Sequence, residues 1–438
     1  MTKLPQVAES MQKVLNDVAR VAGKETGFVE RTSKLRAEIF VQTLVFGWMA
    51  NPAASIEQLT QMAAVLGVEI TPQGLDQRFN QEAANCLKQV LASAVKQAIA
   101  GEPVAIAVLE RFTGLYIFDA STLTLPDQLK AIWEGNGNQI STNSALKPAV
   151  GLDYCSGELN GPFLSDGRAR DFNPSLQQIN LPKGALRLAD LGYFSLDEFA
   201  RLTKKGIYWL SRLQPHIGMY DDKGKHWQVV EFLQRQKGNR VEMEILLGTT
   251  DRLKCRFLAV RVPKEVAQKR RAKLYKERKR DRRNGATPSQ NQLAFADWTV
   301  FVTNAPAELM SLEDALIIAR VRWQIELLFK LWKSHGQIDE WRSQKPWRIM
   351  CEVYAKLIAM LIQHWILITS CWSYPNRSLF KAAQTVQKMA TSLATAFGHI
   401  KQMTVVLSII QRCLAKGCRI NKRRSALSGF EWSQNSKK

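Results

Sequence analysis

The sequence is poor in acidic residues. Asp and Glu number 39 against 61 Lys and Arg among 438 residues, which gives a formal net charge of +22. This imbalance argues against a cationic partner and favours a polyanion, most simply nucleic acid. An acidic membrane surface is the weaker alternative, because the sequence has no lipidation motif and no isolated basic amphipathic segment.

Paired cysteines and an export signal are also lacking. The seven cysteines are odd in number, scattered, and contain no Cys-x2-Cys pair. This spacing predicts neither a disulfide framework nor a zinc site, so we expect core or surface thiols. The start of the chain, Met1–Pro5, has no apolar signal region. A reducing cytoplasm fits these features.

No apolar run suits a membrane span. The most apolar stretch, Leu357–Trp372, is 16 residues long and includes Gln363 and His364, so we expect a buried helix and no membrane partner. Hydrophobic residues make up 46% of the chain. That share is typical of a globular protein, and the length allows two to four domains.

One predicted helix, residues 320–333, carries an unusual distribution of charge. At about 100° per residue, a single carboxylate shares one face with three cations. These residues are Glu326 with Arg322, Lys330 and Lys333, and the opposite face carries Ile325, Leu328, Phe329 and Trp332. A solvated helix with a Glu326–Lys330 pair is the plain alternative.

Two aspartates stand at the ends of apolar, strand-like runs. Asp119 ends the run that begins at Leu115, and Asp190 ends the run that begins at Leu186. A buried strand rarely ends in an acid unless that acid is paired or binds a cation. Together with Glu326, these carboxylates predict a site for Mg²⁺, which prefers oxygen ligands. A cap or turn role is the alternative for each aspartate alone, and Asp153, Asp166 and Asp171 are lower-ranked rival ligands.

The pattern divides the chain into five segments. We expect a helical region at 1–105, strands at 106–215, a β-rich segment at 216–298 (with Trp227–Phe232 as one strand), a strand and the charged helix at 299–345, and a helical region at 346–438. Within the first segment, residues 56–82 resemble a helix-turn-helix, with Gly67 in the turn and Thr71-Pro72 starting the second helix. A plain helical hairpin is the alternative, since Arg78 is the lone cation of the second helix.

A basic run lies at 264–283. It holds eleven Lys/Arg and three acidic residues. A solvated helix or loop and a phosphate-contacting arm are both open, because like charges repel one another unless an anion is present.

These motifs resemble the DDE transposases of bacterial insertion sequences, whose final helix carries a Tyr-x2-Arg-x3-Glu-x6-Lys signature. Arg322, Glu326 and Lys333 match that spacing. Asp119 in Ile-Phe-Asp-Ala-Ser-Thr and Asp190 in Leu-Ala-Asp-Leu-Gly-Tyr-Phe match the two aspartate motifs. The likeness also includes Trp298, and it covers roughly residues 50–345.

The resemblance implies an α/β fold with an RNase H-like catalytic core, interrupted by a β-rich insertion and flanked by helical N-terminal and C-terminal domains. It further implies a nucleoid-associated homodimer that cuts the inverted-repeat ends of its element and joins them to target DNA. Two Mg²⁺ ions, replaceable by Mn²⁺, would sit on Asp119, Asp190 and Glu326. Hairpin-forming relatives hold a flipped base on the tryptophan that Trp298 matches.

Cations near these acids are the candidate DNA contacts. Arg322, Lys330 and Lys333 would position phosphates, with Arg212 as a weaker candidate. Trp298 offers an aromatic face for an extruded base, and a core tryptophan is the alternative.

The signature tyrosine is replaced by Ala319, so one phosphate contact of the family is missing. Two other functions therefore remain open. One is a metal-dependent nuclease that does not join DNA ends, and the other is a DNA-binding regulator of transposition with weakened catalysis.

Overall fold

The computed structural model describes residues 3–30, 34–104, 107–137, 142–169, 174–250, 252–280, 287–374 and 376–420. The chain forms two compact units. Unit 1 comprises residues 1–106, 118–179 and 323–437, and unit 2 comprises residues 107–117 and 180–322. The five predicted segments therefore do not correspond to separate units, because the first and the last segments both contribute to unit 1.

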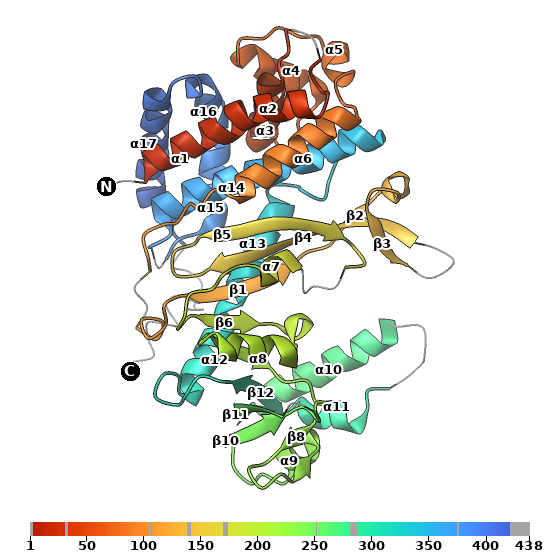
Figure 1. Cartoon of the computed structure of the whole chain (residues 1–438), viewed down its shortest axis with the longest axis vertical. Helices are drawn as coiled ribbons and strands as arrows, with labels where there is room; N and C mark the ends of the chain where they lie inside the picture. The colour runs from red at the N-terminus through yellow and green to blue at the C-terminus, as the bar shows by residue number, and fades with distance from the viewer. Residues whose placement is uncertain are drawn as a thin grey trace. The chain divides into compact units, whose positions relative to one another are not determined.

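Helices form most of unit 1 (Figure 1). They are α1 (Leu4–Gln12), the π-helix η1 (Lys13–Val18), α2 (Ala19–Glu25), α3 (Ala37–Ala50), α4 (Ile56–Val65), α5 (Pro72–Asp76), α6 (Gln81–Val95), η2 (Asp127–Leu129), α7 (Pro174–Gln177), α13 (Trp323–Ser334), α14 (Pro346–Cys371), α15 (Leu379–Lys388), α16 (Ala390–Ala396) and α17 (Ile400–Gly417). The strands of the unit are β2 (Leu123–Leu125), β3 (Glu134–Gly137), β4 (Thr142–Asp153) and β5 (Leu159–Asp166). Strand β4 pairs antiparallel with β2, β3 and β5.

Helix α14 is the core of unit 1. It packs on α3 and α6, and almost all of its side chains are buried. Among the described helices it alone is long and apolar enough to cross a membrane, and its apolar window is 100% buried inside the structure. The predicted buried helix is therefore confirmed. All seven cysteines lie in described segments, and none takes part in a disulfide.

Unit 2 is built around a mixed sheet. Its strands are β6 (Leu186–Ala189), β7 (Tyr208–Arg212), β8 (Met219–Tyr220), β9 (His226–Trp227), β10 (Arg240–Leu247), β11 (Leu253–Arg261) and β12 (Trp298–Thr303). Strand β1 (Leu115–Ala120) contributes its first three residues to this unit and its last three to unit 1. Strands β1, β6 and β7 pair in parallel, whereas β7, β12, β11 and β10 pair antiparallel in that order.

The helices of unit 2 are α8 (Leu196–Lys204), α9 (Val229–Gln234), α10 (Lys264–Arg280), α11 (Gln290–Phe295) and α12 (Leu312–Val321), with the 3-10 turn η3 (Leu191–Tyr193). The expected strand at 227–232 is wrong, because the chain turns into α9 after Trp227. Val229, Phe232 and Leu233 are buried at helical spacing. The segment at 216–298 is thus mixed α/β, not mainly β.

A buried histidine makes the stability of unit 1 depend on pH. His364 in α14 is 4% exposed, and its Nε2 lies 2.7 Å from the carbonyl oxygen of Gly157. Burial lowers the pKa of His364 from 6.5 to about 4. Since the folded pKa lies below the unfolded one, the unfolded chain binds the proton first, and stability is lost as pH falls from 6.5 towards 4.

We predict that His364→Gln, whose amide can still donate to Gly157, removes this contribution. Between pH 7 and pH 4 the wild type should lose roughly 3 kcal/mol more unfolding free energy than the variant, because one pKa unit corresponds to about 1.4 kcal/mol. Urea denaturation at several pH values measures the difference. Parallel pH profiles for the two proteins would contradict the assignment.

Candidate functional site

Asp119 is the fifth residue of β1. The strand buries Leu115, Ile117 and Phe118 and leaves Asp119 half-buried. The carboxylate Oδ1 accepts a hydrogen bond from the backbone N–H of Ala120 at 2.9 Å. An acid thus follows the apolar run Leu115–Phe118, as predicted.

Glu326 lies in the first turn of α13. The predicted apolar face of this helix is confirmed, because Ile325, Leu328, Phe329 and Trp332 are all buried. Glu326 itself is half-buried, and Lys330 is exposed.

Lys333 attaches the far end of α13 to the loop after β1. Its Nζ donates to the carbonyl oxygen of Thr122 at 3.0 Å. Thr122 lies three residues beyond Asp119, so unit 1 holds the signature lysine close to the segment that carries the first acid.

The expected continuous helix is interrupted. Helix α12 ends at Val321 and α13 begins at Trp323, although Arg322 keeps helical dihedrals (φ −52°, ψ −31°). The N–H of Arg322 points to the carbonyl of Arg320, so the regular i to i−4 ladder fails there. The boundary between the two units falls at the same residue.

Asp190 directly follows β6 and forms an ion pair within unit 2. The Arg322 guanidinium lies 3.4 Å from its Oδ2, and the two side chains are 22% and 35% exposed. Both residues line a recess of about 10 Å³, room for roughly one water molecule. The remaining lining residues are Leu188, Leu210, Ser211, Arg212, Phe301 and Ala319.

A buried ion network that sequence reasoning missed involves β6, the strand that precedes Asp190. Arg187 of β6 is 2% exposed and binds Glu198 of α8 at 2.5 Å. Arg201 grips the same carboxylate through two nitrogens, at 2.6 and 2.8 Å. Burial lowers the pKa of Arg187 to about 10, while the charge of Glu198 acts in the opposite direction. The sequence indicates this network only through Arg187, a charged residue inside the apolar run Leu186–Ala189.

Trp298 packs in the sheet of unit 2. It is 4% exposed, and the Arg261 guanidinium lies 4.6 Å from the centroid of its ring. This burial favours the alternative of a core tryptophan, and a role in holding an extruded base stays a prediction. Arg212, at the end of β7, is exposed.

The rival acids have local tasks. Asp153 accepts hydrogen bonds from the N–H of Cys155 and the hydroxyl of Ser156, as turn aspartates do. Asp166 accepts from the N–H of Glu134 at 3.3 Å. Asp171 lies outside the described residues.

The helix-turn-helix candidate contains only a short second helix. Thr71 caps α5 as predicted, but α5 spans five residues. Arg78 donates to the carbonyl of Phe28 and stacks on its ring at 4.5 Å, and Asp76 binds Lys345 and Arg348 at the start of α14. The geometry favours the helical hairpin, and DNA binding by this segment stays a prediction.

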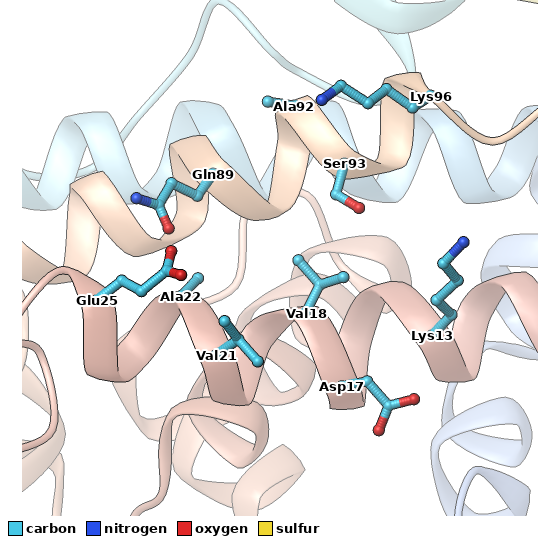
Figure 2. A pocket seen from close by; sticks show the side chains of 10 residues that line it. All are labelled: Lys13, Asp17, Val18, Val21, Ala22, Glu25, Gln89, Ala92, Ser93 and Lys96. Atoms are coloured by element: carbon cyan, nitrogen blue, oxygen red, sulfur yellow. The ribbon is translucent and has the colours of Figure 1, made fainter.

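A groove within unit 1 is remote from these acids in sequence. It has about 700 Å³ and runs between the α1–η1–α2 segment and α6 (Figure 2). Its lining residues are Lys13, Asp17, Val18, Val21, Ala22 and Glu25 from one side and Gln89, Ala92, Ser93 and Lys96 from the other. None of the predicted site residues lines it, so we assign it no catalytic role.

No three Asp, Glu, His or Cys side chains gather into a metal-holding group within the described part of the chain. Asp119 and Glu326 belong to unit 1 and Asp190 to unit 2. The donor chemistry of the three candidate residues nevertheless suits Mg²⁺, because each of them is a carboxylate.

Comparison with known proteins decides the family. A family model for the transposase DDE domain matches residues 110–362, which is more than half of the chain and a range that includes Asp119, Asp190 and Glu326. The chain belongs to the DDE transposase family. The enzyme is thus a transposase of the insertion-sequence type, as the resemblance implied.

Its relatives are insertion-sequence transposases. The transposase of IS231F from Bacillus thuringiensis subsp. israelensis is 28% identical over 82% of this chain and 79% of its own length. The transposase of IS231C from B. thuringiensis subsp. berliner is 26% identical, covering 91% and 84%. That of IS1151 from Clostridium perfringens is 24% identical, covering 84% and 82%.

The network around Glu198 supports the strand that leads to Asp190 in this transposase. We predict that Glu198→Gln lowers the unfolding free energy by about 3–5 kcal/mol, because it leaves Arg187 buried without its counter-charge. Arg201→Gln is the matched control. Arg201 is 38% exposed, and its loss should cost about 1 kcal/mol or less. Equal losses in urea denaturation would refute the distinction.

Proposed function

We propose that this transposase binds double-stranded DNA at the inverted-repeat ends of its element, cuts the ends, and joins them to target DNA. One observation carries the proposal. In unit 2, Ile117 of β1 is the parallel partner of Leu188 of β6, and each catalytic aspartate stands two residues further along its own chain. The carboxyl ends of parallel strands share one edge of a sheet, which is where α/β proteins place their active sites.

Asp119, Asp190 and Glu326 are the proposed ligands of two Mg²⁺ ions, for which Mn²⁺ can substitute. The bound ions would activate the attacking oxygen and stabilise the leaving oxygen of a phosphodiester. The charge of Asp190 is balanced by Arg322 in the structure. If Asp190 bound Mg²⁺ in place of Arg322, the Arg322 guanidinium could donate two hydrogen bonds to a DNA phosphate.

Other cations are assigned to the DNA backbone. Lys330 is exposed beside Glu326, and Arg212 is exposed at the recess that Asp190 and Arg322 line. Lys333 would contact phosphate from its position over the loop after Asp119. Phosphate contacts of this kind fix register and orientation without reading sequence. Trp298 would contact a base only after Arg261 has moved.

The strand arrangement supports an RNase H-like core for the catalytic part. In unit 1, β5, β4 and the end of β1 are neighbours, and in unit 2 the start of β1 is followed by the parallel strands β6 and β7. A homodimer that holds two DNA ends together completes the proposal, because joining requires both ends at one target.

The acids are tested by incubating the purified protein with Mg²⁺ and a labelled end fragment. We predict that Asp119→Ala and Glu326→Gln each lower cleavage at least about 10³-fold, since several kcal/mol of transition-state stabilisation are lost. DNA binding in a gel shift should persist in both. The control Asp166→Asn, which changes a rival acid, should retain cleavage.

The products separate the three candidate functions. Cleaved ends joined to a target indicate a transposase, and cleavage without joining indicates a nuclease. Binding without cleavage in Mg²⁺ or Mn²⁺ indicates a regulator with weakened catalysis. This alternative is included because Ala319 replaces the signature tyrosine of the family. Persistent cleavage by Asp119→Ala would exclude the assigned site. Loss of binding by Glu326→Gln would make α13 a docking element.

A further inference from the structure

The basic run predicted as a helix, loop or phosphate-contacting arm forms the helix α10 up to Arg280. It is polar on nearly every side. Of its side chains from Lys264 to Arg278, only Ala267 is fully buried. A helix without a wide apolar face needs other contacts to hold it.

Arginines on the inner face supply those contacts. Arg270 donates to the carbonyl of Trp298 and the hydroxyl of Thr299, each at 2.8 Å. Arg271 binds the Asp297 carboxylate and donates to the carbonyl of Leu293. Two adjacent guanidinium groups thus fasten α10 to β12 and α11, and they fix which face points to solvent.

The outer face carries lysines at helical spacing. Lys269, Lys273 and Lys276 are exposed and fall on one side of the helix, opposite Ala267. The ion pair of Lys273 with Glu277 is long, at 3.6 Å, and highly exposed, so it contributes little. At about 1.5 Å per residue, the three ammonium groups span roughly 10 Å.

The lysine face is part of the same unit as the recess at Asp190. Burial lowers the pKa of the Arg270 guanidinium, and the positive charge of Arg212 adds to the effect, which reflects the proximity of the two side chains. Arg212 in turn lines the recess with Asp190 and Arg322. Arg212 thus lies near both the recess and Arg270 on the inner face of α10.

We propose that the outer face of α10, formed by Lys269, Lys273 and Lys276, binds the phosphate backbone of double-stranded DNA without reading its sequence. This inference rests on the proposed function, because it identifies a second contact surface for the same DNA. Lysine ammonium groups are mobile point charges, which suit phosphates in many positions better than a fixed base edge. Bound phosphates would also relieve the repulsion among the lysines.

The test is the salt dependence of DNA binding by the full chain. The triple variant Lys269→Gln, Lys273→Gln, Lys276→Gln removes three charges and keeps good helix formers. Each lost phosphate contact lowers the slope of log Kd against log salt by about 0.9, so the slope should fall by about 3. Affinity should weaken at least about tenfold at moderate salt, equally for an element-end duplex and a duplex of unrelated sequence.

Two further variants control the result. The triple Lys→Arg variant at the same positions keeps the charge and should keep the wild-type slope. The triple variant Lys388→Gln, Lys401→Gln, Lys416→Gln makes the same charge change at exposed positions of α15 and α17, and it should lower the slope by less than 1. A wild-type slope for the α10 variant, or a fall no larger than that of this control, overturns the proposal. So does a loss confined to the element-end duplex.

The outcome is independent of the catalytic assignment. Cleavage that survives Asp119→Ala refutes the proposed catalytic site. It does not change how the salt dependence of the α10 variant is interpreted. A normal slope for the α10 variant with normal cleavage refutes only the role of α10.

Discussion

The parallel pairing of β1 with β6 is the constraint on which the candidate site depends. Both strands bury apolar residues before their aspartates, and an acid at one of those positions would be costly. Their register sets Ile117 opposite Leu188. Asp119 and Asp190 each follow one of these paired residues by two positions. Arg322 compensates the charge of Asp190, and Glu198 compensates the charge of Arg187 inside β6.

Much of this arrangement follows from local sequence patterns. The apolar face of α13 was predictable because burial of one face imposes a period of 3.6 on the sequence. The strands that lead to Asp119 and Asp190 and the buried helix α14 were predictable from runs of apolar residues, because an element that is buried on nearly all sides leaves such a run in the sequence.

Other features depend on contacts that no local pattern records. Val229–Gln234 is rich in β-branched and aromatic residues, yet it forms α9 because Phe232 packs against Phe257 and Trp227. Arg78 was expected as the lone cation of the second helix, but it lies beyond α5 and contacts Phe28, 50 residues away in the sequence. The structural roles of Arg187 and Trp298 likewise depend on partners in other elements, namely Glu198 and Arg261. A lone charged or aromatic residue therefore has an ambiguous role until its neighbours are known.

The division of labour between arginine and lysine connects these findings. Buried or half-buried guanidinium groups bind fixed partners within the fold: Arg187 binds Glu198, Arg256 binds the carbonyls of Ala305 and Met310, and Arg270 binds β12. The planar, multiply donating guanidinium can satisfy several acceptors at once, which a buried cation requires. The ammonium groups of α10 stay in water instead. An exposed lysine loses little free energy when it exchanges water for a phosphate. Lysines that remain in water in the folded protein are therefore available to a polyanion.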